Sequence, residues 1–252
     1  LAVSGIKDKE YTGKPVTQNI VIKNGNVVLD EGTDYTVTYS ANTKVGTVEV
    51  TITGTGSYTG EIKKSFDILP AKQQIQKLET RFKGFFIDWA QKGSATGYEI
   101  EYSSNADFKD STVKKLTANK PDTLTISGLT AGNKYYVRVR SYTNVGEKVY
   151  YGAWSDSKNI TAAKYDITKS AISGISTKTY TGKNITQSVK VKYNGKTLKS
   201  GTDYTVSYSS NKNVGTATVK ITGKGQYGGT VSKTFKINPA KQKIQKLTAK
   251  SK

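Results

Sequence analysis

The chain has 252 residues, 35% of them hydrophobic, and a formal net charge of +20. It contains neither Cys nor His, which excludes a disulfide framework, thiolate metal sites and a Cys nucleophile and disfavours a transition-metal site. We therefore expect no cofactor, no metal and no enzyme activity. No run of 18 apolar residues is present, so we expect no membrane insertion by this segment.

The N-terminal stretch, 1–72, consists of short predicted strands separated by turns. Alternating runs rich in Val, Ile, Thr and Tyr predict strands at 20–22, 35–39, 47–53 and 62–68. Asn24 and Gly25 favour a tight hairpin turn because both can adopt positive φ. Asp34 is expected to accept a hydrogen bond from a nearby backbone N–H in its turn. This spacing of strands and turns predicts a β-sandwich.

Residues 170–252 repeat residues 1–83 without a gap. The two stretches share 44 identities in 83 positions. The best-matched part is Gly-Thr-Asp-Tyr-Thr-Val, which begins at Gly32 and again at Gly201. A long fixed period is the signature of an array of modules.

The shared pattern resembles bacterial Ig-like repeats. It consists of Tyr-Thr-Gly-Lys, Gly-Thr-Asp-Tyr-Thr-Val-x-Tyr, Asn, Val-Gly-Thr, Ile-Thr-Gly-x-Gly-x-Tyr-x-Gly and Phe-x-Ile. The resemblance covers most of each copy. It implies an Ig-like sandwich in the extracellular array of a Gram-positive surface protein, and it implies no catalytic residues.

The segment between the copies has a different pattern, which resembles a fibronectin type III domain. The matching positions are Trp89 on the second strand, Tyr98 on the third, Leu129 with Tyr135 at the corner before the sixth strand, and Trp154 on the last. We expect both tryptophans to pack in the core or along a sheet rather than to stack on sugars. Glu99 and Glu101 share one strand face, which we expect to be solvated.

The predicted fold is therefore all-β, with three tandem β-sandwich domains in an elongated array. The predicted domains are an Ig-like copy at 1–72, a fibronectin type III-like domain at 73–163, a Lys-rich Ig-like copy at 164–246 and the start of a next module at 247–252. Pro70 and Pro239 follow strand ends at the two equivalent junctions. Neither junction is rich in Gly or Ser, so we expect limited bending between modules.

Charge is concentrated in the last third of the chain. Residues 1–72 hold 8 basic and 8 acidic residues, whereas residues 164–252 hold 18 Lys and 2 Asp. Because two copies of one fold differ this much, the charge is a surface property that folding does not require. A module of net charge +16 attracts polyanions and loses that attraction as salt rises.

The candidate ligand contacts in this Lys-rich copy are Lys190, Lys192, Lys196 and Lys199. All basic residues there are Lys rather than Arg, and no nucleic-acid motif accompanies them, so we expect no specific nucleic-acid binding. The alternative interpretation of the lysines is an ordinary solvated face.

Tyr150 and Tyr151 are the remaining candidate contacts, as an aromatic platform for a glycan near the last loop. Ordinary strand packing is the alternative interpretation of this pair. A calcium loop at Asp30, Glu31 and Asp34 is disfavoured, because the second copy keeps only the aspartate equivalent to Asp34.

These observations predict a non-catalytic segment of a secreted, wall-associated bacterial protein. It would act as a semi-rigid spacer or adhesion stalk, and we expect a monomer. One alternative is a binding module for anionic cell-wall polymer or for a host glycan or protein. Another is a set of accessory modules in a larger secreted enzyme. Because the chain lacks Met and begins without a signal-peptide pattern, we expect it to be part of a longer protein.

Overall fold

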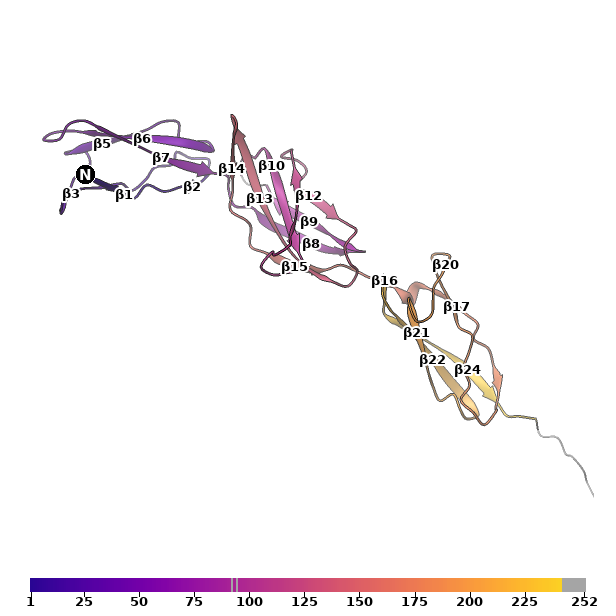
Figure 1. Cartoon of the computed structure of the whole chain (residues 1–252). Coiled ribbons are helices and arrows are strands. Elements are labelled where there is room, and N and C mark those ends of the chain that lie inside the picture. The colour runs from indigo at the N-terminus through magenta and orange to yellow at the C-terminus, as the bar shows by residue number, and fades with distance from the viewer. Residues whose placement is uncertain (92, 94, 242–252) are drawn as a thin grey trace, which may run out of the picture. The chain divides into compact units, whose positions relative to one another are not determined.

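The computed structural model describes residues 1–91, 93 and 95–241, and the regular secondary structure of these residues is almost entirely β-strand (Figure 1). The helical segment within them is a 3-10 turn, η1 (Ile167–Lys169). The prediction of an all-β, multi-sandwich chain is confirmed. The chain divides into two compact units, 1–162 and 163–252. The expected next module at 247–252 and the last residues of the predicted 164–246 copy lie outside the described residues.

The first sandwich has a four-stranded sheet in the order β2-β7-β6-β5 and a three-stranded sheet in the order β1-β3-β4. The strand bounds are β1 (Ala2–Ser4), β2 (Lys9–Glu10), β3 (Val21–Asn24), β4 (Val27–Val28), β5 (Tyr35–Tyr39), β6 (Gly46–Gly54) and β7 (Glu61–Leu69). The four predicted strands correspond to β3, β5, β6 and β7.

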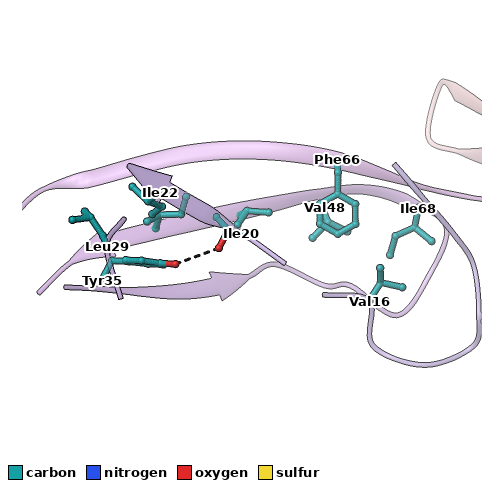
Figure 2. Packing of buried hydrophobic residues seen from close by; sticks show 10 residues of the cluster. Val16, Ile20, Ile22, Leu29, Tyr35, Val48, Phe66 and Ile68 are labelled. Atoms are coloured by element: carbon teal, nitrogen blue, oxygen red, sulfur yellow. Dashed lines mark hydrogen bonds between the residues drawn. The ribbon is translucent and has the colours of Figure 1, made fainter. Parts of the chain in front are cut away.

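Alternation along these strands builds the core of the first sandwich. Val48, Val50 and Ile52 occupy every second position of β6 and are at most 3% exposed. They pack with residues of the other strands, and Figure 2 shows ten members of this cluster. The Tyr35 hydroxyl lies in the same core and donates to the Ile20 carbonyl oxygen at 3.3 Å. The polar end of this buried ring is therefore satisfied.

The turn between β3 and β4 is displaced by one residue from the predicted position. Its central residues are Gly25 and Asn26, and only Gly25 has positive φ, at 61°. The equivalent turn of the second copy has Asn194 and Gly195 at its centre, and both have positive φ. Two-residue hairpins accept either arrangement, so the presence of an Asn-Gly pair does not by itself determine which two residues form the turn.

The predicted role of Asp34 and Asp203 is confirmed in both copies. Asp34 Oδ2 accepts from the Asp30 backbone N–H at 2.9 Å, and Asp203 Oδ2 accepts from the Lys199 backbone N–H at 2.8 Å. These side chains therefore close the loop that precedes β5 and its counterpart β21 (Tyr204–Ser209).

The middle sandwich packs a three-stranded sheet, β12-β9-β8, against a larger sheet in the order β11-β10-β13-β14, with β15 also paired to β13. The bounds are β8 (Gln74–Arg81), β9 (Gly84–Ala90), β10 (Gly97–Ser103), β11 (Thr112–Leu116), β12 (Thr123–Ile126), β13 (Lys134–Val145), β14 (Lys148–Tyr151) and β15 (Lys158–Thr161). Trp89 and Tyr98 are fully buried between the sheets, with ring centroids 5.2 Å apart. The predicted core position of Trp89 is confirmed.

The second copy repeats the sheet orders of the first. Its sheets are β18-β24-β22-β21 and β17-β19-β20, and β16 and β23 form an additional parallel pair. The remaining bounds are β16 (Tyr165–Asp166), β17 (Ala171–Ser173), β18 (Lys178–Thr179), β19 (Lys190–Tyr193), β20 (Lys196–Thr197), β22 (Gly215–Gly223), β23 (Tyr227–Gly228) and β24 (Thr230–Asn238). Ile167 lies ahead of the repeated stretch yet is 0% exposed in this core.

Candidate functional site

Strand β10 is buried along its whole length, on both faces. Tyr98, Ile100 and Tyr102 point into the core, whereas Glu99 and Glu101 lie on the opposite face and are only 7% and 8% exposed. The prediction that these glutamates are solvated is wrong. Side chains from neighbouring strands and loops cover this face of the sheet, so alternation identified the outer face but not its burial.

Two arginines on β13 neutralise these glutamates. Glu99 Oε2 accepts from Arg140 Nε at 2.9 Å and Nη2 at 2.7 Å, and Glu101 Oε2 accepts from Arg138 Nε at 2.5 Å. The register places each glutamate directly opposite its arginine on the adjacent strand. Buried charges require such pairing, because a carboxylate removed from water without a partner is strongly destabilised.

Aromatic rings alternate with the two guanidinium groups over this face. Arg138 lies 4.0 Å from the ring centre of Phe108 and 4.8 Å from that of Trp154, while Arg140 lies 4.3 Å from Trp154 and 4.2 Å from Tyr151. Each contact is within the range of a cation–π interaction. Trp154 therefore packs along the sheet, as predicted, but it lies in the segment between β14 and β15 and not on the last strand. Tyr151 forms the partly exposed end of this row.

Tyr150 points away from Tyr151 and makes a different contact. It is 5% exposed, its hydroxyl lies 2.8 Å from Thr47 Oγ1 of the first sandwich, and Lys148 Nζ lies 4.4 Å from its ring centre. Successive residues of a strand face opposite sides, so Tyr150 and Tyr151 do not share one exposed platform. The contact with Thr47 joins residues 103 positions apart, and no local pattern in the sequence signals it.

The four candidate lysines of the second copy are all exposed, and they occupy different faces of one hairpin. Lys190 and Lys192 lie on the outer face of β19, opposite Ser173 and Ala171 of β17. Lys196 lies directly across from Tyr193, on the other face. Lys199 follows β20, in the loop that Asp203 closes.

These surfaces offer charge, aromatic faces and hydrogen-bonding groups, which are the elements of ligand binding. Within the described residues, no group of three or more His, Cys, Asp or Glu is placed to hold a metal ion. In the same part of the chain, no helix is long and apolar enough to cross a membrane.

Comparisons with known proteins identify one of the domains. Residues 79–153 match the family model of the fibronectin type III domain, inside the range 73–163 where the sequence predicts it. A search of curated proteins gave no significant match.

Two solved structures are similar to this chain, both at low sequence identity and with low TM-scores. A β-1,2-glucanase from Parabacteroides distasonis is 18% identical with a TM-score of 0.29, over 45% of this chain and 17% of the glucanase. The chicken interferon gamma receptor alpha chain is 13% identical with a TM-score of 0.32, over 47% of this chain and 67% of the receptor. The chain thus spans less than a fifth of the glucanase. The match to the family model identifies residues 79–153 as a fibronectin type III domain.

Proposed function

We propose that this chain is a non-catalytic, extracellular segment of a bacterial surface protein, in which it acts as a semi-rigid spacer or adhesion stalk. Fibronectin type III domains are typical of extracellular proteins, and the repeat that surrounds this one resembles the Ig-like modules of Gram-positive surface proteins. The observation that carries the proposal is the junction between the first sandwich and the fibronectin type III domain.

A buried polar network holds the linker at this junction. Gln73 is 2% exposed, and its Nε2 donates to the Ala71 carbonyl oxygen at 2.7 Å and to Ser141 Oγ at 3.1 Å. Ser141, itself fully buried, donates to the same carbonyl at 3.0 Å. Such a network fixes geometry, because breaking any member leaves a buried polar group unsatisfied.

An ion pair at the surface adds a further contact across this junction. Lys148 is the first residue of β14, and its Nζ lies 3.0 Å from Asp67 Oδ2 of the first sandwich. Burial raises the pKa of Asp67, but hydrogen bonds from Thr47 and Lys148 outweigh that effect, so the pKa is lowered overall. The carboxylate therefore stays charged and available to Lys148. A spacer needs junctions of this kind to transmit position from one module to the next.

Spin labels can test whether the junction holds the two domains in one arrangement. The chain has no native Cys, so Thr38→Cys and Thr112→Cys, at exposed strand positions in the two domains, give unique label sites. We expect a narrow distance distribution, and we expect Gln73→Ala with Ser141→Ala to broaden it. Ser40→Ala, a serine of the first sandwich outside the junction, is the control. A broad distribution in the parent chain would refute the semi-rigid spacer.

The exposed lysines of the second copy support a second candidate function, the binding of an anionic wall polymer or glycan. The described part of this copy, residues 164–241, carries 14 Lys and 2 Asp. We expect retention of the full chain on purified cell wall at low salt and its loss as salt rises. Retention that is unchanged by Lys190→Gln with Lys192→Gln would rule out this face as the anionic contact.

A further inference from the structure

Three tyrosine rings line a hollow at one end of the second copy. Tyr165 and Tyr227 face each other across the parallel pair β16–β23, with ring centroids 5.5 Å apart. Tyr193, the last residue of β19, lies 5.0 Å from Tyr165 and 5.6 Å from Tyr227. Tyr165 and Tyr193 are partly exposed, whereas Tyr227 is 6% exposed and forms the floor of the cluster.

The rim of this hollow is polar. Asn194, Lys196, Asp203 and Gln226 complete the lining of this open hollow, and its volume is about 350 Å³. This volume is at the lower end of the range for small-molecule sites, which combine aromatic walls with a few polar groups. Burial, followed by the charge of Asp203, raises the pKa of Tyr227.

The first copy shows that folding does not require this combination. In the gapless alignment of the two copies, Tyr193, Lys196 and Gln226 correspond to Asn24, Val27 and Ser57. Of the lining residues, Tyr227 and Asp203 have identical counterparts in the first copy, Tyr58 and Asp34. The same sheet orders therefore form without the tyrosine at the end of β19 and without the lysine across from it.

The chemistry of the hollow matches a sugar that bears a negative charge. A tyrosine ring offers a rigid, weakly polar face on which the C–H face of a pyranose can pack at low cost in conformational entropy. Asn194, Gln226 and Asp203 can bond to sugar hydroxyls. Within the hollow Lys196 offsets the carboxylate of Asp203, and the large excess of Lys in the domain then favours an anionic substituent on that sugar over a neutral one.

We propose that the hollow formed by Tyr165, Tyr193, Tyr227 and Lys196 is a subsite for one residue of an acidic saccharide. This inference deepens the second candidate function and depends on it, because it names where and how such a ligand is recognised. It differs from attraction to Lys190 and Lys192, which lie on the outer face of β19 and provide charge without an aromatic surface.

The test measures binding of the full chain by calorimetry to four defined probes. These are a trigalacturonate, which carries carboxylates, a sulfated galactan trisaccharide, a neutral galactan trisaccharide and inorganic polyphosphate. The Tyr193→Asn, Lys196→Val double variant introduces residues that the first copy already accommodates. Lys212→Gln with Lys220→Gln, at two exposed lysines away from both the hollow and the outer face of β19, removes more positive charge without touching the hollow and serves as the matched control.

We expect an acidic trisaccharide to bind at least about tenfold more tightly than the neutral one. The Tyr193→Asn, Lys196→Val variant should lose at least about tenfold of this affinity, whereas the control should change it less than about threefold. Comparison of the carboxylated and sulfated probes distinguishes which acidic group the site prefers. Tyr193→Phe, which keeps the ring, should retain binding and thereby separate stacking from a loss of folding.

Three results would overturn the subsite. If polyphosphate binds as tightly as the saccharides and only the control variant weakens it, the second copy attracts polyanions but the hollow has no role. If no saccharide binds while wall retention persists, the second candidate function stands without this site. If neither saccharide nor wall is bound, both fail together and the spacer proposal alone is left.

Discussion

Replacing Glu99 by glutamine preserves the shape of the side chain but removes the charge that Arg140 faces. The Glu99 side chain is 9% exposed and that of Arg140 is 26% exposed. Breaking a buried ion pair typically costs about 3–5 kcal/mol. Here Arg140 keeps some contact with water, stacks on two aromatic rings and can still donate to the glutamine oxygen. We therefore expect Glu99→Gln to lower the free energy of unfolding by about 2 kcal/mol.

Intrinsic fluorescence is suited to this measurement. Both tryptophans, Trp89 and Trp154, lie in the fibronectin type III domain, so urea unfolding followed by Trp emission reports on that domain within the full chain. With a urea dependence of about 1–1.5 kcal/mol per molar, the midpoint should fall by roughly 1.5 M.

A carboxylate in the same domain provides the control for this prediction. Glu79 pairs with Lys77 and Arg81 at the surface, and Glu79→Gln should leave the midpoint within about 0.3 M of the parent. If Glu99→Gln behaves like Glu79→Gln, the inference that Glu99 is held in a covered, charge-paired layer is incorrect. A double-mutant cycle of Glu99→Gln with Arg140→Met should also show coupling of about 1–2 kcal/mol.

Three further outcomes follow from the structure. Because hydrogen bonds at the junction lower the pKa of Asp67, its contribution is fully present above the ordinary aspartate pKa of about 4 and is lost as pH falls through the lowered value. The spin-label distances should therefore broaden in acid, and less so in Asp67→Asn. Gly84→Ala should destabilise the fibronectin type III domain by at least about 2 kcal/mol, since the new Cβ would lie 1.9 Å from a backbone oxygen of β12. Gly128→Ala, at φ +81° in open space, should cost about 1 kcal/mol. Urea unfolding followed by Trp fluorescence measures both changes. Ile167→Ala should cost about 2–5 kcal/mol in the second copy, and an unchanged thermal melting profile of the full chain would show that η1 is not part of that core.

Local pattern was sufficient to predict the sandwich class and the four longest strands of the first sandwich, but not its short strands β1, β2 and β4. The alternation of Val48, Val50 and Ile52 identifies a half-buried strand wherever it occurs, because a strand points successive side chains to opposite faces. The Asp34 turn and its repeat at Asp203 could also be predicted, because their interactions are local. Each depends on a hydrogen bond between residues only four positions apart.

The candidate sites were harder to predict, because they depend on residues that are distant in the sequence. Lys190, Lys192, Lys196 and Lys199 are exposed as expected, but the division of these lysines between two faces depends on strand register. Tyr150 and Tyr151 were candidates for one aromatic platform. Tyr150, however, is buried and contacts Thr47 of the first sandwich, whereas Tyr151 packs on Arg140 at the end of the row of arginines and aromatic rings.

By itself, the sequence determined that this chain is all-β, that it repeats a module without a gap, and that a fibronectin type III domain lies between the copies. These properties follow from the period of side-chain alternation and from turn residues, which act over a few positions. Only the tertiary structure decided that Glu99 is buried, that Gln73 donates to Ser141, 68 positions away, and that Tyr165, Tyr193 and Tyr227 meet in one hollow. Each of those contacts forms when strands from separate parts of the chain are brought together, and burial depends on everything that then covers a face.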